Sequence, residues 1–381
     1  MQTDPTYTLR PTVAEIDLSA LEKNFRSVKR HVGSEVKYMA VVKANGYGHG
    51  AVECARTLEA AGVDWLAVAL VEEGVELRNA GIELPILCLG SFWPGQEQIV
   101  LDRSLTPVIL HIGQANLLDQ AATESGIIAD YHLKIDSGMG RVGIPYNQIG
   151  EVAGELSKFK SLRLDGVMTH FAVADDLSRT DFTNTQIQRF TEGVGVLREC
   201  GFAPEHIDLA NSPAAIAHPN SLGTMVRLGG ILYGLGDDVL PKGIEKPELV
   251  PVMSLKTRVA QIKSVKKGET VGYGQKWVAE CDSIIATIPI GYHDGYRRGL
   301  SNTARALIRG TFVPVAGTIS MDWTTLDVSE LSEVSVGDEV TLVGSDGEKS
   351  ITAENLAKIV GTISYEITCG IGERVPRKYL R

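Results

Sequence analysis

The stretch KYMAVVKANGYGHGAVECARTLEAAGVDWLAVAL, residues 37–70, holds two short apolar runs separated by an amphipathic segment. The runs KYMAVVK and WLAVAL are continuous and short, as is typical of parallel strands that are buried on both faces. Between them, AVECARTLEAAG has the apolar spacing of an amphipathic helix. The stretch therefore predicts a strand, a helix and a further strand of a parallel sheet.

The same rhythm continues along the first two thirds of the chain. Six further apolar runs alternate with helix-like stretches up to residue 230: PILCLG, LTPVIL, DYHLKID, LDGVMTH, HIDLAN and MVRLGG. Eight strands that alternate with helices in this way predict an α/β barrel of the (β/α)8 type.

The pattern changes after about residue 240. Segments such as SIIATIPIG and DEVTLVG alternate or run apolar without long helical stretches, which predicts a second, mostly antiparallel β domain at the C-terminus. The proline-containing DDVLPKGIEKPELVP is the expected linker, and ITAENLAKIVG predicts one helix, capped by Thr352 and ended by Gly361. We expect domains at 1–240 and 241–381, with the first ten residues or so able to pack with the second.

Composition narrows the classes of function. The net charge of −10 with scattered Lys and Arg argues against nucleic acid as a partner. Five dispersed cysteines indicate neither a disulfide framework nor a zinc site and favour reduced, cytoplasmic surroundings, and the eight histidines form no HExxH or HxH motif, so no metal site is expected. No signal peptide pattern and no apolar run of membrane-spanning length is seen, so no membrane partner is expected.

Polar residues close several of the predicted strands. Catalytic side chains of (β/α)8 barrels lie at the C-terminal ends of the strands. A lysine or histidine there is, taken alone, more often a solvated or structural residue, but here the polar residues fall at the same end of successive strands. They are Lys43, Asp136 with the following Arg141, His170, Asn211 with Ser212, and Arg227 with Gly229 and Gly230.

Lys43 in the absence of a metal motif points to Schiff-base chemistry with a carbonyl group. Pyridoxal phosphate would use a donor for its ring nitrogen and a phosphate cradle after the seventh and eighth strands, where Arg227, Ser212 and the two glycines lie. We also expect a buried Arg227 to face an acceptor or anionic group.

From about residue 10 to its end, the chain resembles the alanine racemases. The motifs that carry the resemblance are AVVKANGYGHG, HLKIDSGMGRVG, GVMTHFA, ANSPAA, MVRLGGILYGL, VGYG, IPIGYHDGY, ISMDW, SYEI and RVPR. The resemblance implies a pyridoxal 5'-phosphate-dependent racemase, a barrel followed by a β domain, and a homodimer with shared active sites that supplies D-alanine for peptidoglycan precursors.

The resemblance also implies roles for individual residues. Lys43 would hold the cofactor and act as one base, and Tyr273, supplied by the other subunit, would act as the opposing acid and base, as racemisation through a planar carbanion requires. Cofactor contacts are implied for Tyr47, His170, Ser212, Arg227, Gly229, Gly230 and Tyr365, substrate carboxylate contacts for Arg141 and Met321, and supporting or entrance positions for Lys134, Asp175, Tyr292 and Asp322. Lys134 matches a lysine that is carbamylated in many members.

Two positions depart from the pattern of the family, and three alternative functions compete with the one it implies. Thr318 stands where many members carry an entrance arginine, and AVADD at residues 172–176 differs from the commoner wording. A basic amino-acid decarboxylase would need a cysteine and aspartate set where MDWTTLD stands, and a non-catalytic pyridoxal-phosphate-binding protein would lack the second domain. A racemase of broader specificity, acting on serine or larger side chains, stays open.

Overall fold

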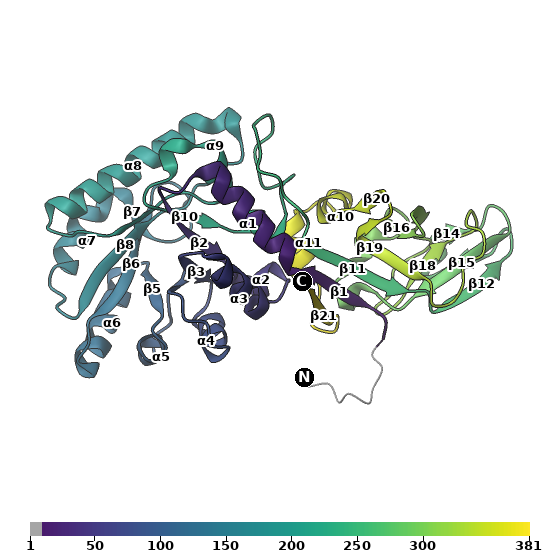
Figure 1. Ribbon diagram of the computed structural model, residues 1–381, viewed down its shortest axis with the longest axis horizontal. Helices are drawn as coiled ribbons and strands as arrows, with labels where there is room; N and C mark the ends of the chain where they lie inside the picture. Colours follow the sequence, from purple (N-terminus) through teal and green to yellow (C-terminus); the bar gives the residue numbers. More distant parts are fainter. Residues whose placement is uncertain (1–9) are drawn as a thin grey trace. The chain divides into compact units, whose positions relative to one another are not determined.

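The computed structural model describes residues 10–381, which form two compact units (Figure 1). One unit comprises residues 21–250, and the other comprises residues 251–381 with the N-terminal segment up to Ala20. The expectation for the first ten residues falls mainly on residues 1–9, which lie outside the described part. The boundaries thus fall at 20/21 and 250/251, whereas the sequence led us to expect one at 240/241.

Asn24 explains why the expected linker stays with the first unit. Its side chain is fully buried, its Nδ2 donates to the carbonyl oxygens of Val250 at 2.8 Å and Leu232 at 3.0 Å, and its Oδ1 accepts from the Val250 N–H at 2.7 Å. These bonds tie the end of the 237–251 segment to α1 (Leu18–Val32).

The first unit is a closed barrel of parallel strands, as predicted. In residues 10–381 its strand order is β5-β4-β3-β2-β10-β9-β8-β6, and pairing of β5 with β6 closes the ring. The strands are β2 (Lys37–Val41), β3 (Trp65–Val68), β4 (Ile86–Cys88), β5 (Thr106–Ile109), β6 (Ala129–Asp136), β8 (Leu162–Met168), β9 (His206–Asp208) and β10 (Met225–Leu228), with the short β7 (Ile144–Pro145) beside β6. Each of the eight predicted runs supplies one barrel strand.

Helices alternate with these strands along the chain (Figure 1). After α1 they are α2 (Lys43–Tyr47), α3 (Ala51–Ala61), α4 (Val71–Asn79), α5 (Glu97–Asp102), α6 (Ile112–Ser125), α7 (Ile149–Leu156), α8 (Thr180–Glu199) and α9 (Ser212–Ala217). Strands β3, β4, β5 and β10 are buried at every position. Burial on both faces accounts for the continuous apolar runs of the sequence.

The second unit is mostly antiparallel, also as predicted. Its main sheet has the order β17-β16-β19-β11-β1-β21, with β20 paired to β19; a second sheet has the order β12-β15-β18, and β13 pairs with β14. The strands are β1 (Val13–Asp17), β11 (Met253–Arg258), β12 (Gln261–Val265), β13 (Thr270–Val271), β14 (Trp277–Val278), β15 (Ser283–Ile288), β16 (Arg305–Ile308), β17 (Thr311–Pro314), β18 (Thr324–Asp327), β19 (Glu339–Asp346), β20 (Lys349–Ile351) and β21 (Arg377–Leu380).

The helix predicted near the C-terminus is α10 (Ala353–Val360). The Thr352 side chain accepts a hydrogen bond from the Asn355 N–H, and Gly361 ends the helix in the left-handed conformation with φ of 72°. Both predicted end signals are therefore confirmed. A further short helix, α11 (Ser364–Cys369), was not predicted. No helix in residues 10–381 is long and apolar enough to cross a membrane.

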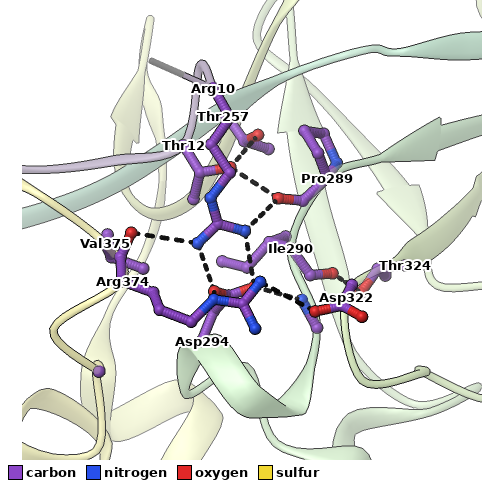
Figure 2. Close-up of polar contacts among 12 residues, drawn as sticks. Arg10, Thr12, Thr257, Pro289, Ile290, Asp294, Asp322, Thr324, Arg374 and Val375 are labelled. Carbon is purple, nitrogen blue, oxygen red and sulfur yellow. Dashed lines mark hydrogen bonds and ion pairs between the residues drawn. The ribbon is translucent and has the colours of Figure 1, made fainter.

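A buried carboxylate fixes the loops of the second unit (Figure 2). Asp294, with a fully buried side chain, is ion-paired with Arg10, whose Nη1 also donates to the Pro289 carbonyl oxygen at 3.1 Å. Arg374 bridges two loops, since its Nε lies 3.4 Å from Asp294 Oδ1 and its Nη2 donates to Asp322 Oδ1 at 2.8 Å. Arg10 and Arg374 thereby hold the loop that follows β15, and Arg374 joins it to the loop that precedes β18.

We expect Asp294→Asn to lower the free energy of unfolding by about 2–3 kcal/mol at neutral pH, because it leaves Arg10 with half of its ion pair. Burial favours a raised pKa for Asp294, but Arg10 and the Gly291 N–H outweigh burial and hold the pKa below its usual range. The carboxylate therefore stabilises the fold above the unfolded-state pKa of about 4, and the effect is lost as the pH falls through the folded-state value.

Urea unfolding of both proteins at several pH values measures this contribution. The control is Asp282→Asn, which breaks an exposed ion pair with Lys266 in the same unit and should change the stability by less than about 1 kcal/mol. Equal effects of the two substitutions, or a constant difference between Asp294→Asn and the original protein down to pH 3, would contradict the role given to Asp294.

Candidate active site

Lys43 lies at the start of an unusual turn that follows β2. The next four residues all have positive φ angles: Ala44 (52°), Asn45 (53°), Gly46 (61°) and Tyr47 (53°). Hydrogen bonds from the Gly46 N–H to the Val42 carbonyl oxygen (2.8 Å) and from the Gly48 N–H to the Ala44 carbonyl oxygen (2.9 Å) hold the turn. Consecutive left-handed residues other than glycine are strained, and such strain is concentrated at functional sites. The turn places Lys43 and Tyr47 at the C-terminal end of the barrel.

Arg227 is the most completely engaged polar side chain at this end. It is 3% exposed and is ion-paired through Nη1 with Asp208, whose side chain is fully buried. Its Nη2 donates to the Thr169 carbonyl oxygen at 2.8 Å and lies 3.3 Å from His170 Nδ1. Asp208 is the anionic group that Arg227 was expected to face.

Sequence reasoning did not single out Asp208. Its signal was the presence of an aspartate inside the apolar run HIDLAN, on the strand next to that of Arg227. Burial raises the pKa of Asp208 while Arg227 opposes that rise. Because a guanidinium stays protonated in proteins, direct contact with it keeps the Asp208 carboxylate charged and keeps Arg227 oriented.

The contacts of Arg227 leave one donor available. Nη1 and Nη2 are occupied as described, and the Nε–H has no hydrogen-bond partner within residues 10–381. Arg227 as a whole is 3% exposed, so an acceptor on a bound group would satisfy this N–H. The nitrogen of a pyridine ring, which carries one lone pair, fits this donor.

His170 accepts from Arg227 as a neutral imidazole. Burial, together with the positive charges of Arg227 and Lys134, holds the pKa of His170 well below its ordinary value. The charges of Arg141 and Lys43 act in the same direction. The four predicted cations of the barrel unit therefore converge on one half-buried ring.

Tyr47, Ser212 and Gly229 form a cradle that suits a phosphate group. The Ser212 hydroxyl accepts from the Gly229 N–H at 2.9 Å, and a Cβ placed on Gly229 would lie 2.6 Å from the Tyr47 hydroxyl oxygen. Only glycine fits at that position. Gly230 follows directly and begins a short buried 3-10 helix. Two hydroxyls beside a glycine backbone are groups that suit a phosphate and hence the predicted cofactor.

Lys134 and Arg141 lie on β6 and in the loop that follows it. Lys134 is buried, and burial together with the cations of Arg227 and Arg141 lowers the pKa of Lys134 to about 8. The loop is held by Asp136, whose carboxylate accepts from the Gly138 N–H at 2.9 Å and from the Gly140 N–H. The arrangement keeps Arg141 near a lysine that is partly neutral near pH 8.

The second unit brings its own predicted residues together. Tyr273, Met321 and Tyr292 are exposed by 72%, 50% and 41%. The Thr318 hydroxyl donates to the Tyr273 carbonyl oxygen at 2.8 Å, and the Tyr292 N–H donates to the Ser320 carbonyl oxygen at 3.0 Å. Thr318 and Ser320, which precede Met321, therefore hydrogen-bond to the backbones of both tyrosines. Asp322 is held by Arg374 (Figure 2).

The other predicted positions lie elsewhere. Tyr365 is on α11 of the second unit, and Asp175 lies in the loop of the barrel unit just before a short 3-10 helix at Leu177–Arg179. The structure thus groups the predicted residues in two sets, one in each unit. In the second unit, Tyr273 and Met321 are both largely exposed.

Comparison with known proteins gives a consistent result over the whole chain. Residues 16–237 match the family model for the alanine racemase N-terminal domain, and residues 252–379 match that for the C-terminal domain. An alanine racemase of Geobacter sp. strain M21 is 45% identical over 379 residues, covering 97% of this chain and 99% of the relative. One from Symbiobacterium thermophilum is 43% identical, with 97% of each chain covered.

Solved structures agree. The alanine racemase of Clostridium difficile 630 superposes with a TM-score of 0.90 at 38% identity, covering 98% of this chain and 97% of the other. An alanine racemase from Bartonella henselae with covalently bound pyridoxal phosphate superposes with a TM-score of 0.87 at 27% identity, covering 97% of this chain and 99% of the other.

The left-handed turn after Lys43 makes a prediction about stability. Gly46→Ala should cost about 1–2 kcal/mol for the positive φ and more for crowding, because the new Cβ would lie 3.3 Å from the Ala51 nitrogen. Gly62→Ala is the matched control, since Gly62 also has a positive φ (86°) but no atom within 4 Å of its Cβ position. Urea unfolding measures both, and a Gly46→Ala cost no larger than that of Gly62→Ala would show that the turn is not crowded.

Proposed function

Because the chain belongs to the alanine racemase family of isomerases, we propose that it interconverts L-alanine and D-alanine by a two-base mechanism that uses pyridoxal 5'-phosphate. The observation that carries the cofactor assignment is the Nε–H of Arg227, the one remaining donor of an otherwise saturated guanidinium, at the same end of the barrel as the Tyr47, Ser212 and Gly229 cradle. The product D-alanine would serve peptidoglycan precursors in the cytoplasm.

Residues of the barrel unit would hold the cofactor. Lys43 Nζ would bind it covalently, Arg227 Nε would donate to the ring nitrogen, and His170 would lie along the ring. Tyr47, Ser212, Gly229 and Gly230 would bind the phosphate, and the same role is proposed for Tyr365 of the second unit. When bound, pyridoxal phosphate acts as an electron sink that makes the substrate Cα–H acidic.

Arg227 would set the reaction type. A permanently charged guanidinium, fixed by Asp208, cannot accept a proton from the ring nitrogen and leaves that nitrogen unprotonated. Electron withdrawal through the ring is then weaker than with a carboxylate partner. We infer that this arrangement suppresses transamination as a side reaction.

Two bases on opposite faces would move the proton. Lys43 Nζ removes it on one face of Cα, and the hydroxyl of Tyr273 of the partner subunit returns a proton on the other face, with the reverse roles in the opposite direction. We propose a homodimer because Tyr273 and Met321 are exposed in the single chain. Arg141 would receive the substrate carboxylate together with Met321 of the partner subunit. Asp175, Tyr292 and Asp322 would line the entrance.

Deuterium incorporation tests the proposal. L-alanine incubated in D2O with the pyridoxal-phosphate-loaded protein should give D-alanine that carries deuterium at Cα, and Tyr273→Phe should slow this by at least about a hundredfold. Tyr146→Phe, which removes a hydroxyl from another exposed tyrosine, should have no effect. Chiral chromatography with mass spectrometry measures both. Racemisation of serine or larger amino acids with alanine unchanged would favour the broader-specificity alternative.

The phosphate cradle makes a separate prediction. Gly229→Ala should displace the Tyr47 hydroxyl and weaken cofactor binding by at least about tenfold, equivalent to about 1.4 kcal/mol. Absorption titration of the apoprotein with pyridoxal phosphate gives the dissociation constant. Gly195→Ala, on a helix with no atom within 4 Å of the added Cβ, is the control and should leave it unchanged.

We propose that Lys134 is carbamylated and thereby orients Arg141. The pKa of about 8 leaves a substantial neutral fraction of the amine, whose nitrogen can bond to the carbon of CO2 with loss of one proton. Protein equilibrated with 13C-labelled bicarbonate should show a carbamate carbonyl resonance in NMR that is absent in Lys134→Met. Its absence in the original protein at pH 8 would contradict the proposal.

A further inference from the structure

A single glutamate joins the loops that follow two neighbouring strands at the C-terminal end of the barrel. Glu73 is the third residue of α4, the helix that follows β3. Its Oε2 accepts from the N–H groups of Ala69 at 2.7 Å and Leu70 at 3.1 Å, directly after β3. Its Oε1 accepts from the Ala44 N–H at 2.6 Å. Ala44 directly follows Lys43, so one carboxylate links the turn after β2 to the loop after β3.

One oxygen of Glu73 has an ordinary structural role. A glutamate or glutamine at the third position of a helix commonly accepts from the N–H of the residue that caps the helix, as Oε2 does from Leu70. This role needs one oxygen and stays within α4 and its cap. Ala44 belongs to a different strand and helix, 29 residues away, so capping of α4 does not account for the bond to Oε1.

Pairing of β2 with β3 ends just before Ala44. The last pair in the register is Val41 with Ala67, and the Val42 N–H donates to the Ala67 carbonyl oxygen at 2.8 Å. The N–H of Ala44 lies in the first turn of α2, where backbone donors have no acceptor within the helix itself. Glu73 supplies the acceptor that neither the sheet nor the helix provides.

The bond to Ala44 constrains Lys43 directly. Lys43 and Ala44 share one planar peptide group, so fixing the direction of the Ala44 N–H fixes the ψ angle of Lys43. The positive φ angles begin at Ala44, and such strained backbone persists only where its surroundings hold it. A carboxylate makes stronger hydrogen bonds to an N–H than a neutral acceptor does. Glu73 therefore holds the turn at the point where its unusual conformation starts.

We propose that Glu73 is a positioning residue for Lys43. Through the Ala44 N–H, its Oε1 sets the backbone orientation from which the Lys43 amine reaches pyridoxal phosphate and the substrate Cα. The inference rests on the proposed function and deepens it, because it concerns the same lysine. Displacement of a reacting group by about 1 Å can cost about a hundredfold in rate, so loss of this one bond should be measurable.

Glu73→Gln separates the two roles of the side chain. Its amide oxygen can cap α4 as before, but its NH2 group cannot accept from the Ala44 N–H. Glu72→Gln is the matched control, since it removes the same charge from the adjacent position of the helix, where an exposed carboxylate accepts from Gln96 Nε2 at 3.0 Å. Both variants should melt within about 4 °C of the original protein.

Two measurements follow the turn and the lysine without turnover. Amide hydrogen exchange at Ala44 in the pyridoxal-phosphate-loaded protein should be at least about tenfold faster in Glu73→Gln than in the original protein. Covalent attachment of pyridoxal phosphate to Lys43, trapped with borohydride and quantified by mass spectrometry, should be at least about tenfold slower. Glu72→Gln should change neither rate by more than about twofold.

Kinetic isotope effects test the role of Lys43 as a base. In the proposed two-base scheme, Lys43 takes the proton from one enantiomer of alanine, and Tyr273 of the partner subunit takes it from the other. In Glu73→Gln, the primary deuterium isotope effect measured with Cα-deuterated alanine should rise for one enantiomer only. A general loss of structure would lower both rates without this asymmetry.

Unchanged exchange at Ala44 or unchanged attachment to Lys43 in folded Glu73→Gln would overturn the proposal, whether or not the original protein racemises alanine. Slower attachment in Glu73→Gln, together with an original protein that racemises no alanine, would contradict the proposed function and support the role of Glu73. If Glu73→Gln does not fold, Glu73→Asp decides: its carboxylate is one carbon shorter and should not reach Leu70 and Ala44 together, so attachment as fast as in the original protein would overturn the role.

Discussion

Closure of the barrel is the constraint on which the other features depend. Pairing of β5 with β6 leaves none of the eight strands with an open edge, and the parallel direction of all eight brings their C-terminal ends to one rim. Lys43 and Arg227 are far apart in the sequence. They lie near each other at this rim because β2, which precedes Lys43, pairs directly with β10, which contains Arg227. The same closure brings the N-terminal ends of the strands together at the other rim.

The barrel unit pairs its charged groups in two ways. At the C-terminal end, the ion pair between Arg227 and Asp208 stabilises a buried cation and fixes the orientation of its remaining donor, the Nε–H. Midway along β8, the partly exposed Asp165 lies beside two imidazoles; burial favours a raised pKa for Asp165, but His132 and His206 outweigh burial and hold the pKa below its usual range. A buried charge is costly unless it is paired, and the Arg227–Asp208 pair meets this requirement inside the barrel.

Local signals in the sequence predicted much of the fold. The eight runs became strands because burial on both faces imposes a continuous apolar pattern, and Thr352 and Gly361 mark a helix through bonds made within a few residues. Asp208, the unit boundary at Asn24 and the two histidines beside Asp165 were missed because each depends on contacts between strands or segments distant in the chain. The left-handed turn was also missed, since Ala44 and Tyr47 are not residues that favour positive φ.

Strand β1, which precedes the barrel in the sequence, belongs to the second unit, whose other strands follow the barrel. β1 lies in the main sheet of the second unit, antiparallel to β11 and parallel to β21, so its partners begin at Met253 and Arg377. During synthesis on the ribosome the barrel strands, up to Leu228, emerge before either partner exists. The chain therefore cannot fold in strict order along its sequence: the barrel can close first, while β1 lacks both of its partners until β11 and then β21 have been synthesised.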